Sequence, residues 1–337
     1  MNKASVLIFT YNQAGYICQA LEGACSQTMK PVEIIVVDDA STDSTFDVAQ
    51  KWISERGDPL LSIVRNKYNL GLVASMSTWA SQARGSVVIP MAGDDISDPA
   101  RVEQVVRHFN SNPLSYALVA SGKTIDKDGR LIGAYGNGID RAIHLSTLDP
   151  DDGEFLDGLG ATGASTSYRR ELFTFFLPMS ADAFAEDRIL CFRALLLGTC
   201  DFSSFNHVLW RRHEANLSRD TRLERSAALA THFNRCVAMV NQHLDDLKQL
   251  GEDFSEKNQR LQKALRYQRA RWALWSAANS TGLPMLRFAE AWSELRSHAP
   301  SASCLVLDSI RPVLHLLTPF AIRQALARSK SRLIKPQ

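Results

Sequence analysis

Short β-branched runs alternate with longer amphipathic stretches over residues 4–120, and this alternation constrains the fold more than any other feature. A strand followed by a helix and then by another strand is typical of βα units, in which helices cover a mainly parallel sheet. We therefore expect an α/β fold. The predicted strands are 5–9, 33–37, 61–64 and 86–91, and the predicted helices are 14–26, 44–55, 72–83 and 101–110.

The pattern changes after Tyr116. Asp128-Gly129 lies between two apolar runs, 123–125 and 131–134, and predicts a β-hairpin turn. We expect a first domain over 1–220 and an α-helical C-terminal extension over 221–337. The further predicted elements are strands at 165–168 and 205–211 and helices at 186–197, 223–250, 256–280, 283–297 and 305–328.

Cysteine usage and hydropathy favour a cytoplasmic protein. The six cysteines include no C-x-x-C pair, so we interpret them as buried thiols in a reducing compartment. No apolar run reaches the 18 or so residues of a membrane-spanning helix, and the first residues lack the pattern of a signal peptide.

Polar clusters follow three predicted strands of the sheet. Thr10-Tyr11-Asn12 ends the first strand, Asp38-Asp39 the second and Gly93-Asp94-Asp95 the fourth. Ligands of open parallel sheets bind beyond the carboxyl ends of the strands. Carboxylates gathered there repel one another unless a cation or hydrogen-bond donors lie between them, and a metal-bound nucleotide supplies both.

The sequence contains neither G-x-G-x-x-G nor G-x-x-x-x-G-K-[ST], so it has neither a dinucleotide fingerprint nor a P-loop. Acidic residues mark the strand ends instead. Mg²⁺ and Mn²⁺ take oxygen ligands and keep substrate phosphates in their coordination shell, so one or two Asp side chains suffice. We predict a divalent metal cofactor, Mn²⁺ or Mg²⁺.

These motifs resemble those of family 2 glycosyltransferases, and the resemblance covers residues 4–218. Several strings follow in the order of that family, and together they make an accidental match improbable. The strings are Ser5-Val-Leu-Ile-Phe-Thr-Tyr-Asn12, Val36-Val-Asp-Asp-Ala-Ser-Thr-Asp-Ser-Thr45, Asn69-Leu-Gly71, Gly93-Asp-Asp95, Gly163-Ala-Ser-Thr-Ser-Tyr-Arg-Arg-Glu-Leu-Phe173, Glu186-Asp187 and Arg211-Arg-His-Glu-Ala-Asn-Leu-Ser218.

The resemblance implies a GT-A fold with a nucleotide-binding half at about 1–115 and an acceptor half at about 116–220. It places Asp95 as the direct metal ligand, with His213 near the diphosphate and the metal. The donor is then a nucleotide-diphosphate sugar, with UDP-sugars favoured and dTDP-sugars second. The implied nucleotide-binding residues are Thr10, Tyr11, Asn12, Asp38, Asp39 and Asp94.

The resemblance also implies an inverting transfer in which Asp187 is the general base. Glu186, Arg211 and Arg212 would lie on the diphosphate and acceptor side. The sequence departs from the family at Ala92, where members often have a further acidic residue, and this leaves fewer acidic ligands for a metal. It also has Thr10 where many members have Pro.

Each of these assignments has a structural alternative. Asp38 and Asp39 can end a strand and cap the following helix, and Asp94-Asp95 can be a solvated turn. Acidic residues at 186 and 187 favour a helix dipole without any catalytic role, and His213 can be a surface residue. For the whole protein, the alternatives are a catalytically silent nucleotide-sugar-fold scaffold and a sugar nucleotidyltransferase, although residues 10–15 lack the Gly-rich basic loop of the latter.

The C-terminal region is strongly basic. Residues 257–337 hold 14 Lys and Arg against 3 Asp and Glu, a net charge of +11 that leaves −9 on residues 1–256. Basic helices with Trp272, Trp275 and Trp292 suit an anionic membrane surface, and equally a helical bundle with solvated charges. No nucleic-acid motif accompanies the charge. We expect a glycan or lipid-linked acceptor in surface polysaccharide biosynthesis, at the inner face of the cell membrane.

Overall fold

The structure is a computed structural model, and it describes most of the chain. The described residues up to Asn216 form one compact unit, and those from Ser226 on form a second. The boundary predicted at 220 falls between them, in a stretch outside the described residues. The described residues are 2–136, 138–148, 163–183, 185–214, 216, 226–251, 256–279, 284–299 and 305.

The first half of the first unit is a parallel sheet in the strand order β3-β2-β1-β4. Each strand is mostly apolar and is followed along the chain by a helix, with the short strand β5 between β4 and α4, so the predicted βα units are confirmed. The strands are β1 (Ala4–Thr10), β2 (Glu33–Asp38), β3 (Leu61–Arg65) and β4 (Val87–Ala92), and the helices are α1 (Ile17–Cys25), α2 (Thr45–Arg56), α3 (Leu72–Ser81) and α4 (Arg101–Ser111).

The sheet continues with mixed strand directions through β9, β6, β10 and β5. β9 lies antiparallel between β4 and β6, and β6 pairs in parallel with β10. β5 and β8 are elements that the sequence did not indicate. The bounds are β5 (Ile96–Ser97), β6 (Ser115–Ile125), β7 (Leu131–Tyr135), β8 (Arg141–His144), β9 (Thr166–Arg169), β10 (Thr199–Arg211), α5 (Glu171–Thr174) and α6 (Glu186–Leu197), with 3-10 turns η1 (Leu145–Thr147) and η3 (Gly163–Ser165).

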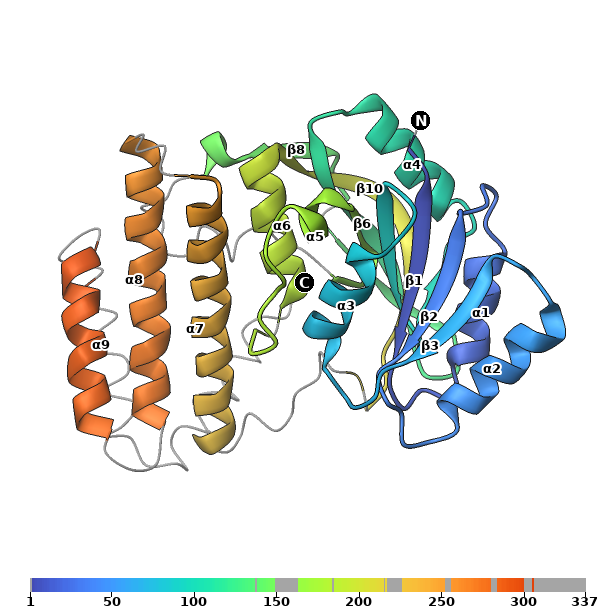
Figure 1. Cartoon of the computed structure of the whole chain (residues 1–337), viewed down its shortest axis with the longest axis horizontal. Helices are drawn as coiled ribbons and strands as arrows, with labels where there is room; N and C mark the ends of the chain where they lie inside the picture. The colour runs from blue at the N-terminus through green and yellow to red at the C-terminus, as the bar shows by residue number, and fades with distance from the viewer. Residues whose placement is uncertain are drawn as a thin grey trace. The chain divides into compact units, whose positions relative to one another are not determined.

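Helices cover both faces of this sheet (Figure 1). Alternate residues of β1, namely Ala4, Val6 and Ile8, pack in one apolar core with residues of α1, α2 and α4. On the other side α3 contacts β1 and α5, while α6 contacts β6 and β10. The carboxyl ends of the four parallel strands lie at one edge of this sheet.

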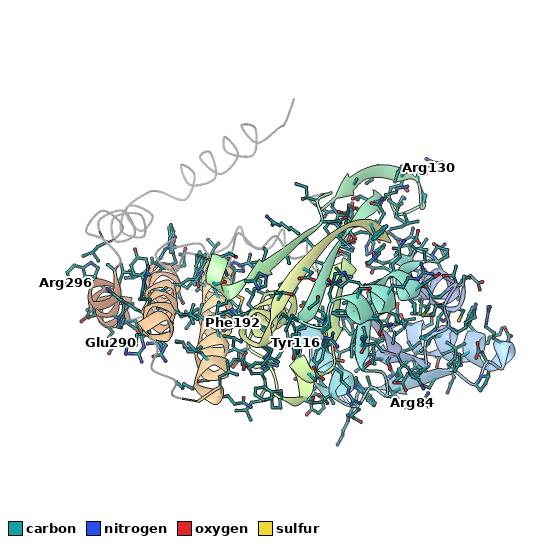
Figure 2. The ribbon with its side chains drawn as sticks, turned by 90° about the horizontal axis from the view of Figure 1, so that it is seen from above. Arg84, Tyr116, Arg130, Phe192, Glu290 and Arg296 are labelled. Atoms are coloured by element: carbon teal, nitrogen blue, oxygen red, sulfur yellow. The ribbon has the colours of Figure 1, made fainter. Side chains whose placement is uncertain are left out.

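β6 and β7 form the predicted hairpin, and Figure 2 shows Arg130 at its end. Gly129 has φ +86°, a conformation that favours glycine, and its N–H donates to the carbonyl of Asp126 at 3.1 Å. Farther along, Gly122 lies directly opposite Tyr135. The ring of Tyr135 covers the place where a side chain at position 122 would stand.

The second unit contains three long helices in its described part, α7 (Ser226–Gln249), α8 (Glu256–Asn279) and α9 (Pro284–His298). α8 contacts both other helices, and its Tyr267, Ala270 and Leu274 are buried against Ala291 and Leu295 of α9. The predicted helix at 305–328 lies outside the described residues apart from Leu305.

The tryptophans of this unit differ in their surroundings. Trp272 and Trp275 pack on Phe233 of α7 with ring centroids 5.7 and 5.6 Å apart, which is the packing of a helical bundle. Trp292 is 38% exposed beside the guanidinium of Arg296. None of the helices in the described part is long and apolar enough to span a membrane.

We expect Gly122→Ala to destabilise the first unit by about 1–3 kcal/mol, because the added methyl group collides with the Tyr135 ring. Gly133→Ala in β7 is the matched control, since no atom lies within 4 Å of its added methyl group. Urea unfolding of both variants measures the difference. Equal stability of the two would show that the ring moves aside without cost.

Candidate active site

Residues from the ends of β1, β2 and β4 meet at one edge of the sheet, as the parallel pairing requires. Thr10 is paired with Asp38 in register, and the N–H of Gly93 donates to the carbonyl of Phe9 at 2.9 Å. A side chain at Gly93 would stand 2.5 Å from Thr10 Oγ1, so the loop after β4 packs closely on the end of β1.

Asn12 joins the loops that follow β1 and β2. Its Oδ1 accepts from the N–H groups of Thr42 at 2.8 Å and Asp43 at 3.3 Å, and its own N–H donates to Ser41 Oγ at 3.0 Å. It has φ +54°, a conformation that Asn tolerates better than most residues. Asn12 therefore holds these two loops together, whereas the neighbouring Tyr11 is 42% exposed.

Asp38 and Asp39 are both buried, but they have different partners. Asp38 Oδ1 accepts from the N–H of Ser41 at 3.0 Å and pairs with Arg65 Nε at 3.3 Å. Asp38 Oδ2 is buried and has no hydrogen-bond partner among the described residues. A buried carboxylate oxygen in that state is suited to accept a hydrogen bond from a ligand.

Both oxygens of Asp39 bind the loop before α3. Oδ1 accepts from Asn66 Nδ2 at 2.7 Å and from the N–H of Leu70 at 2.9 Å, and Oδ2 accepts from the N–H of Gly71 at 2.9 Å. Gly71 has φ +77° at the start of α3. Asp39 thus orders residues 66–71, and sequence reasoning missed the part of Asn66.

The loop after β4 brings Asp94, and not Asp95, beside His213. Asp94 Oδ2 lies 2.9 Å from His213 Nε2 and accepts from Asn216 Nδ2 at 3.2 Å. Asp95 is 2% exposed, and its Oδ1 accepts the N–H of Arg211 at 2.8 Å. Burial, followed by the neighbouring Asp94, raises the pKa of Asp95 well above its usual range.

The side chain of Arg211 stabilises the loop that carries Asp94 and Asp95. Its guanidinium is fully buried and donates to the carbonyl of Asp94 at 2.8 Å and to Gln19 Oε1 at 2.6 Å. The ring of Tyr16 lies 4.9 Å from this guanidinium and also stacks on His213 with centroids 4.9 Å apart. Arg212 turns to the other side of the strand, with its guanidinium 4.5 Å from the ring of Trp210.

Glu186 and Asp187 begin α6 beside η3. Glu186 is buried, and burial together with Asp187 raises its pKa to about 8. Burial also raises the pKa of Asp187, although the N–H groups of Arg188, at 2.8 Å, and Gly163 donate to its carboxylate. A helix dipole alone would lower both pKa values, so burial outweighs it here.

The structure thus gathers Thr10, Asn12, Asp38, Asp39, Asp94, Asp95, Arg211 and His213 at one sheet edge and places Glu186 and Asp187 at the start of α6. Sequence reasoning missed Tyr16, Asn66 and Asn216 as partners of these residues. Asn216 lies within the Arg211–Ser218 string, so the sequence could have indicated Asn216 as a site residue. Nothing in the sequence indicated Tyr16.

Comparison with known proteins identifies the family of this site. A model of Glycosyl transferase family 2 matches residues 5–176, just over half of the 337 residues. The chain belongs to glycosyltransferase family 2. The match contains the acidic sheet edge as far as Asp95, while Asp187 and His213 lie beyond it.

Relatives of known sequence agree with this family 2 assignment. An uncharacterised glycosyltransferase of a Nostoc species is 27% identical over 290 residues, covering 81% of this chain and 85% of that protein. The putative glycosyltransferase EpsE of Bacillus subtilis is 33% identical over 123 residues, 36% of this chain, and the chain spans 44% of EpsE. The chondroitin synthase of Escherichia coli is 28% identical over 128 residues, covering 38% of this chain and 18% of the synthase.

Solved structures show the same fold. S. aureus TarS residues 1–349 in complex with UDP has a TM-score of 0.58 and 17% identity, covering 88% of this chain and 89% of that one. The mannosyltransferase PcManGT from Pyrobaculum calidifontis, solved with GDP-Man and Mn²⁺, has a TM-score of 0.51 and 17% identity, covering 93% and 87%. This family 2 chain therefore has the predicted GT-A fold with additional C-terminal helices.

The raised pKa of Glu186 predicts a pH-dependent stability. The folded state holds the proton up to a pH of about 8, whereas the unfolded chain releases it near 4.5, so this contribution to stability is complete below pH 4.5 and is lost as the pH rises through 8. We therefore expect the Tm of the wild type to fall as the pH rises from 5 to 8.5. The Tm of Glu186→Gln should fall less over the same range.

Differential scanning calorimetry of both proteins measures this effect, and about 1 kcal/mol corresponds to about 2–4 °C in a domain of this size. Glu171→Gln is a control, because Glu171 begins the neighbouring helix α5 on the exposed surface. Parallel Tm curves for the wild type and Glu186→Gln would contradict the assignment of a protonated Glu186.

Proposed function

We propose that the protein is an inverting glycosyltransferase that moves a sugar from a nucleotide-diphosphate sugar to an acceptor hydroxyl. One observation carries the proposal: the sheet edge joins Asp94 to His213, and a separate half-buried carboxylate, Asp187, lies at the start of α6. Family membership alone leaves the reaction open, since a silent scaffold would share the fold.

The sheet edge offers groups for a nucleotide. Asp38 Oδ2 is a buried acceptor without a partner among the described residues, and Thr10 and Tyr11 stand beside it at the end of β1. We assign them, with Asn12 and Asp39 as the residues that order the surrounding loops, to the nucleoside side of the donor. TarS was solved with UDP and with UDP-GlcNAc, which favours a UDP-sugar here over a dTDP-sugar.

A divalent cation fits beside Asp94. A carboxylate oxygen and an imidazole nitrogen lie 2.9 Å apart there, with their side chains 7% and 10% exposed. No group of three or more His, Cys, Asp and Glu gathers in the described part, so substrate phosphates would supply further ligands. Mn²⁺ or Mg²⁺ would neutralise the charge that develops on the leaving diphosphate. This geometry favours Asp94 with His213 over Asp95 as ligands.

Asp187 is the proposed general base. The acceptor oxygen attacks the anomeric carbon from the face opposite the diphosphate, the bond from that carbon to the diphosphate oxygen breaks, and Asp187 takes the acceptor proton. This displacement inverts the anomeric centre. Because burial raises the pKa of Asp187, the carboxylate accepts a proton more readily than an exposed Asp. Glu186, protonated below pH 8, holds no competing charge there.

The proposed acceptor class rests on the net charge of the C-terminal region and on the names of similar proteins. The chondroitin synthase of Escherichia coli and EpsE, named a glycosyltransferase, are among the similar proteins. Residues 257–337 carry a net charge of +11, which suits an anionic membrane surface. We assign a glycan or lipid-linked acceptor in surface polysaccharide biosynthesis, with the protein acting on the cytoplasmic face of the membrane.

A thermal-shift panel tests the donor and the metal. We expect a UDP-sugar to raise Tm in the presence of Mn²⁺ and to do so much less with EDTA, because a ligand of the native state stabilises it by RT ln(1 + [L]/Kd). GDP-, dTDP- and CMP-sugars serve as comparisons. Asp94→Asn and His213→Gln should each lose the Mn²⁺-dependent part of the shift.

Absence of a shift with every nucleotide would favour the silent scaffold. A shift that survives in both variants would instead remove Asp94 and His213 from the metal site. Asp245→Asn is a control in α7, where the carboxylate is exposed and pairs with Lys248.

Single substitutions separate catalysis from binding. Asp187→Asn should lower transfer at least about 1,000-fold while leaving nucleotide Kd within a few fold, because the base acts only on the acceptor proton. Asp39→Ala should raise nucleotide Kd, because it releases residues 66–71. Hydrolysis-corrected transfer assays and calorimetric titration measure these effects. Equal loss of nucleotide binding in both variants would overturn the two assignments.

A further inference from the structure

The central sheet is interrupted between β4 and β6. β9 joins them, but it pairs with β4 only at Val87 and Val88. Alongside the rest of β4, the chain forms the 3-10 turn η3 (Gly163–Ser165) in place of a strand. Among the described residues, the pairing of β4 with β9 therefore does not extend to Pro90 and Ala164, and their carbonyl groups need another donor.

Arg101 supplies this donor. It is the first residue of α4 and is 0% exposed, and its Nη2 donates to the carbonyls of Pro90 at 3.0 Å and Ala164 at 3.4 Å. Nε and Nη1 have no hydrogen-bond partner among the described residues. Removing a guanidinium from water is costly, so a fully buried arginine at this place requires an explanation.

The two carbonyls belong to segments that lead to the two parts of the site. Pro90 lies in β4, whose end carries Asp94 and Asp95. Ala164 follows Gly163, whose N–H donates to the carboxylate of Asp187. A side chain at Gly163 would stand 2.5 Å from Glu186 Oε1, so η3 also packs closely on the start of α6.

We propose that Arg101 is a positioning residue, whose guanidinium fixes η3 to β4 and thereby sets Asp187 against the donor edge of the sheet. The inference rests on the proposed function, since Asp187 acts there as the base. Arg101 touches neither donor nor acceptor in this role. A displacement of a reacting group by about 1 Å can lower the rate about 100-fold, so a rigid bridge between the two parts matters for catalysis.

The test compares Arg101→Met and Arg101→Lys with wild type. We expect Arg101→Met to lower kcat about 10–100-fold while the Kd of the UDP-sugar stays within about 3-fold, because the nucleoside groups do not depend on η3. The kcat of Arg101→Lys should lie between those of wild type and Arg101→Met, since the lysine ammonium can reach one carbonyl but lacks the planar guanidinium. If Arg101→Met does not fold, Arg101→Lys alone decides the kcat comparison.

Arg169→Lys is the matched control. Its guanidinium also donates to main-chain carbonyls, those of Ser115 at 2.6 Å and Phe109 at 3.1 Å, but at the end of β9 away from η3. We expect its kcat to stay within about 2-fold of wild type. A kcat loss in Arg169→Lys as large as in the Arg101 variants would reduce Arg101 to a general stabilising residue and overturn the proposal.

Hydrogen exchange gives a readout that needs no turnover. The amides of Gly163, Ala164 and Ser165 should exchange faster in Arg101→Met and Arg101→Lys than in wild type or Arg169→Lys, as measured by mass spectrometry of overlapping peptides. Unchanged exchange there together with wild-type kcat overturns the proposal. If wild type transfers no sugar from any donor, the proposed function fails, while the exchange result still decides whether Arg101 holds η3.

Discussion

Carboxylates that are buried together at the edge of a sheet must each find donors, and the rest of the site depends on how this chain supplies them. Asp39 binds the N–H groups of Leu70 and Gly71, and Asp95 binds the N–H of Arg211. Each bond joins a strand end to a segment far away in the sequence. The acidic residues therefore order the loops at this edge of the sheet through hydrogen bonds within the protein.

Buried arginines complement these carboxylates in a different way. Arg211 donates mainly to main-chain carbonyls, including those of Asp94 and Lys127, and Arg101 does the same for Pro90 and Ala164. A planar guanidinium presents several donors in fixed directions, so one side chain can join two or three segments that share no ladder. The positive charges also offset the acidic edge, and Arg101 retains its proton because burial lowers its pKa only to about 10.

The acidic groups lie in different environments. Asp94, beside His213 and Asn216, lies where hydrogen-bond partners surround the carboxylate. Glu186 is buried, so its pKa rises to about 8. Burial thus keeps a proton on Glu186 at neutral pH, whereas Asp94 is held by side-chain partners.

The sequence by itself determined the parallel half of the sheet, the hairpin at Asp128-Gly129 and the helix Glu186–Leu197, because periodicity and turn chemistry are local. It also predicted that Thr10, Asp38 and Asp94 lie together, since parallel strands end at one edge. Its motifs did not show that Asp94, and not Asp95, faces His213, nor that Arg101, which reads as an ordinary helix residue, is fully buried. These features depend on side-chain directions and on contacts between segments up to 119 residues apart, and only the tertiary structure decides them.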